Sequence, residues 1–265
     1  MPRQRTLLHE DATVRIERVT SGLPTDRWSA SYEAETSRWV LPEGGCTEFR
    51  TEDGNLLVDG TTAMHLPCAL PYRMKPGEGV QESVVVSAMH PPATEAVEAQ
   101  RSSSTSWCLQ PLAVWRLHCL WRDLARGDAV DGNALHDLPV PLCGQRLHPP
   151  GDEPASHAVL RARRFMAQRA SVQDFARWTL HDVADAAHVS SFHLARVFRR
   201  QVGTSLHGYR QRLRLAEAMR RLRHGERDLA GLSHDLGFSG QSHFGQVFVQ
   251  AIGTTPSRAR ARLSR

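Results

Sequence analysis

The side chains with the clearest chemical meaning lie in two short segments near the C-terminus. In the first segment, residues 191–201, helical spacing puts Leu194, Val197 and Phe198 on one face, which should pack on the preceding helix. The outward face then carries Phe192, Ala195, Arg196, Arg199 and Arg200. An outward arginine can donate two hydrogen bonds to guanine O6 and N7, a pair that contributes about 1–3 kcal/mol of base discrimination. We therefore expect Arg196 to read a base, and Arg199 and Arg200 to hold phosphates.

The second segment repeats this outline with different chemistry. Phe244, Val247 and Phe248 should form its buried face. Its outward residues are small or uncharged, namely Gln241, Ser242, Gly245 and Gln246. Glutamine can pair with adenine and serine can reach several base edges, whereas none of these residues attracts a phosphate by charge. We expect this segment to contribute base contacts but less affinity than the first.

Both segments belong to an internal repeat. The first copy reads TLHDVADAAHVSSFHLARVFRRQVGTS over residues 179–205, and the second reads DLAGLSHDLGFSGQSHFGQVFVQAIGTT over residues 228–255. Matching pairs recur 49 or 50 residues apart, namely Val183-Ala184 with Leu232-Ser233, Val189-Ser190 with Phe238-Ser239, and Gly203-Thr204 with Gly253-Thr254. Each copy predicts a short helix, a tight turn and a second helix, which is the outline of a helix-turn-helix unit.

Local signals define the helices that should position these units. A first helix is expected over residues 157–169, and Thr179 with Asp182 three residues later has the pattern of a capping box. Gly203 should end the outward segment, and Thr204 or Ser205 should begin a long helix that runs to about His224.

That long helix should join the two units rigidly. One buried stripe is predicted from Leu206, Tyr209, Leu213, Ala216 and Met219, with the remaining surface occupied by Arg210, Arg212, Arg214, Arg220, Arg221 and Arg223. Two outward helices held in this way could enter successive major grooves on one face of DNA, about 34 Å apart.

Charge is divided unevenly along the 265 residues. Residues 1–154 carry 14 Lys and Arg against 21 Asp and Glu, whereas residues 155–265 carry 19 Arg against 7 acidic residues. The overall charge of +5 therefore conceals a strongly basic half beside an acidic one. This asymmetry indicates a polyanion, double-stranded DNA, as the partner of the basic half; the alternative is an ordinary solvated basic surface.

Residues 38–89 have strand character. Short apolar runs over residues 38–41, 47–50, 55–58 and 83–86 are separated by turn chemistry at residues 42–45, 52–54, 59–60 and 76–77. This spacing favours a small antiparallel β-barrel or jelly roll. Residues 91–106 are polar and are expected to form a loop.

A helix is predicted from Trp107 to Arg126, with apolar residues on more than one face. We expect one face to pack on the barrel and the other on a second subunit; complete burial within one chain is the alternative. Five prolines, Pro139, Pro141, Pro149, Pro150 and Pro154, predict a linker over residues 138–156. The fold class is therefore α+β, with a β-rich domain over residues 1–137 and an all-helical domain over residues 157–265.

The segment from about His157 to Arg262 resembles the DNA-binding domain of AraC/XylS transcription regulators, through the two repeats and the connecting RLRLAEAMRRL. The resemblance implies base-facing roles for Phe192, Ala195, Arg196, Gln241, Ser242 and Gln246, in agreement with the helical faces. Family members usually carry Arg or Lys at the positions of Gln246 and Val249-Gln250, and an aromatic residue near Ala259. We therefore expect a weaker grip on the DNA backbone from the second unit.

The N-terminal half is similar to the cupin-type effector domains of the same family, through GGCTEFRTEDGNLLVDG and LPCALPYRM. This similarity implies a small-molecule effector or a homodimer, and the family's role implies RNA polymerase as a further partner. Trp39, His65 and Tyr72 could line an effector pocket, although core packing is the preferred role for each.

An enzyme is the rival class, either a metal cupin or a cysteine-based methyl acceptor. The candidate ligands His65, Cys68 and His90 are scattered, and the strands contain no HxH pair, so neither a metal nor another cofactor is expected. The five cysteines, Cys46, Cys68, Cys108, Cys119 and Cys143, form no CxxC pair and are expected to be reduced structural thiols. A third reading is an architectural DNA-binding protein without an effector. No signal peptide or membrane-spanning stretch is apparent, so a cytoplasmic protein is expected.

Overall fold

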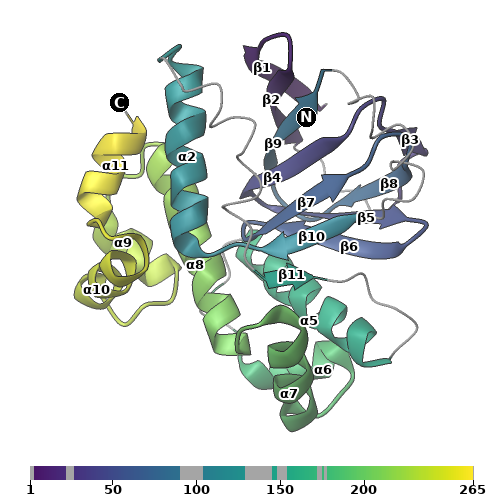
Figure 1. Cartoon of the computed structure of the whole chain (residues 1–265). Helices are drawn as coiled ribbons and strands as arrows, with labels where there is room; N and C mark the ends of the chain where they lie inside the picture. The colour runs from purple at the N-terminus through teal and green to yellow at the C-terminus, as the bar shows by residue number, and fades with distance from the viewer. Residues whose placement is uncertain are drawn as a thin grey trace.

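The computed structural model describes residues 3–21, 27–89, 104–128, 145–147, 154–171, 175 and 178–264. A β-sandwich forms the N-terminal half and helices form the C-terminal half, with one further helix lying between them (Figure 1). The α+β fold class predicted from the sequence is confirmed.

The larger sheet of the sandwich has seven strands. Their spatial order is β1 (Gln4–Glu10), β2 (Val14–Ser21), β9 (Gln81–Ala88), β4 (Arg38–Gly44), β7 (Thr62–Leu66), β10 (Thr105–Cys108) and β11 (Gln145–Leu147). Every neighbouring pair is antiparallel. Strands distant in the chain are therefore adjacent in space, as in a jelly roll.

The smaller sheet has four strands in the order β3 (Tyr32–Glu33), β8 (Pro71–Pro76), β5 (Cys46–Thr51) and β6 (Gly54–Asp59). The two sheets pack face to face through alternating inward side chains. This core contains Val40, Met64 and Leu66 from the larger sheet and Phe49, Leu56, Val58 and Tyr72 from the smaller one.

The strands predicted over residues 38–41, 47–50, 55–58 and 83–86 are confirmed as parts of β4, β5, β6 and β9. The turn expected at residues 42–45 was wrong in part, because β4 continues to Gly44 through a bulge between Pro42 and Gly44. A proline is tolerated at this position of the strand because the backbone at a bulge does not need the N–H hydrogen bond that proline lacks. Most of the loop expected over residues 91–106 lies outside the described residues, and its last two residues belong to β10.

The helix predicted from Trp107 is α2 and runs from Pro111 to Ala125. Trp107 and Cys108 instead pair with β7, and Pro111 starts the helix because its missing N–H is not needed there. Helix α2 contacts β1 on one side and α8, α10 and α11 on the other. The same chain thus covers much of α2, but Leu112 is 39% exposed, and the second subunit stays a prediction.

The described residues of the C-terminal half form seven helices: α5 (Pro154–Ser171), α6 (Leu180–Ala187), α7 (Ser191–Val202), α8 (Leu206–Arg223), α9 (Leu229–Asp235), α10 (Gln241–Ile252) and α11 (Pro256–Ser264). The predicted capping box is present, because Thr179 Oγ1 accepts from Asp182 N at 3.3 Å and the Asp182 carboxylate accepts from Thr179 N at 2.6 Å. Gly203 ends α7 with a φ of 73°, and Ser205 caps α8. The predicted capping of α6, end of α7 and start of α8 are thus confirmed, whereas α5 runs from Pro154 to Ser171 and is longer than the predicted 157–169.

Strand β11 falls inside the segment expected to be a linker. It extends the large sheet by pairing with β10, and α5 begins at Pro154. Pro139, Pro141, Pro149 and Pro150 lie outside the described residues. The domain boundaries at residues 137 and 157 remain a prediction.

Candidate nucleic-acid interface

The first helix-turn-helix unit consists of α6, the turn at residues 188–190 and α7. Ser190 caps α7 by accepting a hydrogen bond from His193 N at 3.3 Å. Leu194, Val197 and Phe198 are buried, as the sequence predicted. The opposite face is open to solvent along its length and comprises Phe192, Ala195, Arg196, Arg199 and Arg200. Phe192 is 83% exposed, more than any other large apolar side chain among the described residues.

The second unit consists of α9, the turn at residues 237–240 and α10. Phe244 and Phe248 are fully buried, whereas Val247, predicted to be buried with them, is half-buried. The outward residues Gln241, Ser242 and Gln246 are exposed, and Gly245 is half-buried. All eight side chains proposed to touch DNA are therefore accessible.

The two turns share one backbone conformation at equivalent positions. His188 has a φ of 57° in the first copy, and Gly237, 49 residues later, has a φ of 71°. A left-handed residue here ends the first helix and redirects the chain into the second. Glycine adopts this conformation readily, but histidine does so only at an energetic cost.

Helix α8 joins the two units and is covered on every side. Its predicted stripe is buried, and so are residues outside that stripe: Leu215, Glu217, Ala218 and Leu222. Its arginines are half-buried rather than exposed. Because α8 packs on α2, α5, α7, α11 and β4, it forms a rigid connection within the molecule.

Carboxylates of the sandwich hold the C-terminal end of α8. Glu82 lies 3.0 Å from Arg223, 3.1 Å from His224 and 3.9 Å from Arg220. Glu43 lies 3.3 Å from Arg223. Burial alone would raise the pKa of Glu82, but the hydrogen bond to His224 and the charges of Arg223 and Arg220 lower it to about 2. These arginines are thus engaged inside the protein and do not supply charge to an outside partner.

A second contact between the two halves is fully buried. The hydroxyl of Tyr209, on α8, donates to the carboxylate of Asp59, which lies 3.6 Å from Arg163 on α5. Arg163 also donates to Leu57 O at 3.1 Å and Thr62 Oγ1 at 2.8 Å. The sandwich and the helical half therefore share one hydrogen-bond network.

Accessible positive charge remains on α7 and at the start of α11. Arg258, which the sequence analysis did not single out, is exposed in the first turn of α11, directly after the second unit. The equivalent position of the first copy, 50 residues earlier, is Gly208, so the repeat gave no signal for this arginine. Arg200 also lines a cavity of about 330 Å³ between α7, α5, β6 and β11.

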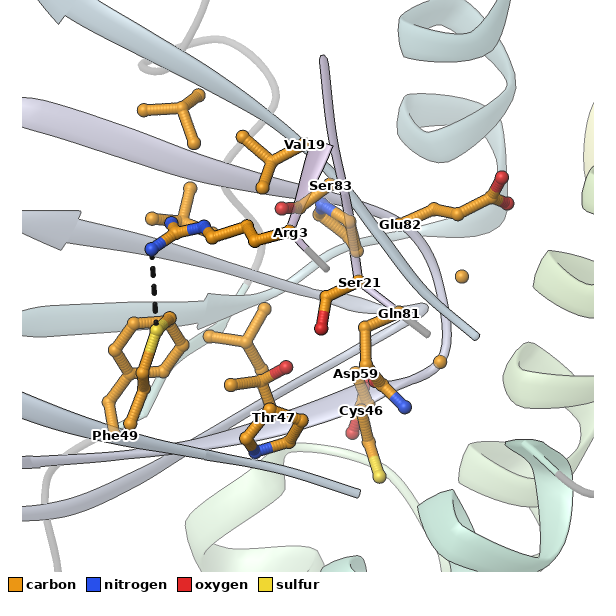
Figure 2. Close-up of a pocket in the computed structure, with 18 of the residues that line it drawn as sticks. Arg3, Val19, Ser21, Cys46, Thr47, Phe49, Asp59, Gln81, Glu82 and Ser83 are labelled. Atoms are coloured by element: carbon orange, nitrogen blue, oxygen red, sulfur yellow. Dashed lines mark hydrogen bonds between the residues drawn. The ribbon is translucent and has the colours of Figure 1, made fainter. Parts of the chain in front are cut away.

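A further cavity, of about 70 Å³, lies inside the sandwich. Figure 2 shows Arg3 on one side of it, directed away from the helices, and Glu82 on the other, directed toward them. Of the three residues considered for an effector pocket, only Tyr72 lines this cavity. Trp39 and His65 stack on each other at 5.1 Å, and Trp39 also stacks on Trp107 at 4.8 Å; burial lowers the pKa of His65.

Within the described residues, no three His, Cys, Asp or Glu side chains converge as metal ligands would. Cys46, Cys68, Cys108 and Cys119 form no disulfide with one another, and Cys143 lies outside the described residues. None of the described helices combines the length and apolar character needed to cross a bilayer.

Known proteins resemble this chain over the same region. A helix-turn-helix domain model matches residues 183–262. A putative AraC-like transcription regulator of Streptomyces antibioticus is 27% identical over 82% of this chain and 62% of its own length. The HTH-type transcriptional activator RhaR of Klebsiella pneumoniae is 30% identical over 54% of this chain and 52% of its own length. The chain thus spans about half to three fifths of these curated relatives.

Among solved structures, ToxT from Vibrio cholerae is 9% identical, with a TM-score of 0.36 over 94% of this chain and 98% of ToxT.

Proposed function

We propose, from the premise that residues 183–262 form an AraC-type helix-turn-helix domain, that this protein is a sequence-specific DNA-binding transcription regulator that responds to an effector. One observation carries the proposal. Two helix-turn-helix units each bury an aromatic core and leave an accessible outward face, and the covered helix α8 holds both units in one body.

The two outward helices would divide the work of recognition. Arg196 would bond guanine, Phe192 and Ala195 would contact thymine methyl groups, and Arg199 and Arg200 would hold phosphates. On α10, Gln241, Ser242 and Gln246 would contact base edges. Arg258 of α11 would supply the phosphate contact that α10 lacks.

The N-terminal half would be the effector domain. Its sandwich contains a cavity, and two residues lining that cavity, Asp59 and Glu82, hold the helices of the DNA-binding half. A ligand in the cavity could therefore alter how α8 is held.

Other partners follow from this role. A transcription regulator acts by contacting or obstructing RNA polymerase, which we propose as a partner in the cytoplasm. A homodimer also remains a proposal, and the exposed Leu112 of α2 is a candidate for its contact.

Selection of bound sites from random duplex DNA, with the full chain, tests the proposal. We expect a consensus with two conserved segments about one helical turn apart, and an affinity that falls steeply with salt because phosphate contacts release counterions. Binding without any consensus would instead identify an architectural protein. Salt-independent binding would contradict phosphate contact altogether.

A further inference from the structure

The cavity in the sandwich has an uncompensated positive end. Arg3, Arg5 and Arg38 line it together. Arg5 is paired with Glu17 at 2.8 Å, but the only side-chain partner of Arg3 among the described residues is the sulfur of Met74, at 3.7 Å (Figure 2, dashed line). Within that same part of the chain, no carboxylate reaches Arg38. Two guanidinium groups thus face the cavity without a carboxylate in ion-pair distance among the described residues. The carboxylates that also line it, Asp59 and Glu82, are already paired with cations of the helical half.

Two buried polar atoms at this cavity lack a hydrogen-bond partner among the described residues. They are the donor Nε of Arg38 and the acceptor Oε1 of Gln81. Leaving a buried donor or acceptor unsatisfied is destabilising, and a bound water, ion or ligand is one way in which such atoms are satisfied. Partial removal from water and the positive charge of Arg5 both lower the pKa of Arg3, as repulsion within a cluster of arginines requires.

Polar groups line one part of the wall, among them Ser21, Thr47 and Ser83, and apolar side chains line another. Val19, Val40, Phe49, Val58, Leu66 and Val85 line it between the two sheets. A water needs about 10–15 Å³ of such space, so a volume of about 70 Å³ holds roughly five to seven non-hydrogen atoms. The shape and chemistry therefore favour a small molecule with one charged group and a short apolar body.

We propose that this cavity binds a small organic anion, whose carboxylate or phosphate group is held by Arg38 and Arg3. The proposal rests on the effector role assigned above and names the chemical class of that effector. Arginine suits this task because its planar group donates two parallel hydrogen bonds to such an anion.

The experiment measures binding to the full chain by titration calorimetry with pairs that differ only in charge: acetate and acetamide, butyrate and butyramide, hexanoate and hexanamide. Inorganic phosphate and methyl phosphate test the other anionic group. We expect at least one carboxylate to bind at least about tenfold more tightly than its amide, or one phosphate to bind at least about tenfold more tightly than any amide. A tenfold difference in affinity corresponds to about 1.4 kcal/mol, and a charge-assisted hydrogen-bond pair exceeds this. Equal affinity of acids and amides, or no binding by any anion, would overturn the proposal.

Two variants locate the site. In Arg38→Gln, the affinity for the anion should fall to within about twofold of the affinity for the amide. Arg3→Gln should also lower the affinity for the anion, and the fold should tolerate it because Arg3 is exposed. Arg73→Gln is the matched control, because Arg73 lies on the outward side of β8, next to Tyr72, and is exposed. An anion that still binds both Arg38→Gln and Arg3→Gln with wild-type affinity would place the site elsewhere and refute the assignment.

DNA binding by the same preparation separates this inference from the proposed function. If the chain selects a DNA consensus but shows no preference for anions, the regulator stands and the anion site fails. If anions bind through Arg38 but no DNA is bound, the cavity assignment stands and the regulator fails.

Discussion

At the scale of single residues, the accessible arginines of α7 differ in what they should recognise. Arg196 lies on the proposed base-reading face, and Arg199 is placed to hold a phosphate. Arg196→Ala should therefore relax preference at one base position, by about 1–3 kcal/mol. Arg199→Ala should weaken all sites alike and reduce the slope of affinity against salt by about 1. A panel of single-base variants of the selected site measures both, and identical profiles for the two variants would contradict the assignment.

Glu82 should make stability depend on pH. Its pKa of about 2 in the folded protein lies below the ordinary value of 4.5, so its ionised form stabilises the fold above pH 4.5, and that contribution fades as the pH falls toward 2. Glu82→Gln should lower the free energy of unfolding by about 3 kcal/mol at pH 7 and by progressively less below pH 4.5.

Urea unfolding of the wild type and Glu82→Gln between pH 7 and pH 3 tests this expectation. The exposed Glu52→Gln is the control, since its carboxylate has no such cluster to hold. If the difference in free energy of unfolding between the wild type and Glu82→Gln stayed constant from pH 7 to pH 3, Glu82 would act through packing rather than charge.

At the scale of elements, the two helix-turn-helix units can be compared at an equivalent position of their turns. His188 and Gly237 occupy the same left-handed position of the two turns. His188→Gly should stabilise the protein by about 1 kcal/mol, because a side chain in this conformation costs about 1–2 kcal/mol and glycine avoids most of that cost. Gly237→Ala should destabilise it by at least as much, since the new Cβ would also lie 2.9 Å from the Arg214 guanidinium.

Gly245→Ala is the contrasting substitution, because it lies inside α10 and a Cβ there meets nothing within 4 Å. It should stabilise the helix by about 0.5–1 kcal/mol. Unfolding in urea ranks the three variants. If His188→Gly proved destabilising, the histidine side chain would have to make a contribution larger than the strain.

Most of the helical half could be predicted from sequence because its signals are local. Thr179, Gly203 and Ser205 act within one turn of chain, and the apolar spacing of α7 and α10 reports their buried faces directly. The partners of α8 could not be predicted in this way, because Glu43 and Glu82 are distant in the chain. Strands β1 and β2 were missed as well, since the exposed residues of the edge strand β1 carry little apolar pattern.

At the scale of the whole molecule, the separation of charge found in the sequence serves two purposes. Part of the basic half neutralises the acidic half internally, through Glu82, Glu43 and Asp59. Exposed arginines remain on α7 and α11, at Arg196, Arg199, Arg200 and Arg258, and also at Arg169 and Arg227. Net charge alone predicted a polyanion partner, but only the structure shows which arginines are available to it.

Breaking the buried contact between Asp59 and Arg163 should separate the two halves. Arg163→Leu would leave a fully buried carboxylate without its positive partner, which costs about 3–5 kcal/mol. We expect calorimetry to show two unfolding transitions in this variant where the wild type shows one. Arg116→Leu, at an exposed position of α2, should leave the single transition intact. A single transition in Arg163→Leu at the wild-type temperature would show that this contact does not couple the halves.

The 18-residue length of α8 has a consequence for the genome as well as for the protein. At 1.5 Å per residue it fixes a span of about 27 Å between the elements it joins, and nothing along it can stretch. In the regulator proposed above, α8 would therefore fix the distance between the two DNA segments that the protein recognises. One base pair inserted between the two recognised segments would rotate one of them about the DNA axis by about a tenth of a helical turn. Because α8 is rigid, the protein could not adjust to this rotation and contact both segments at once.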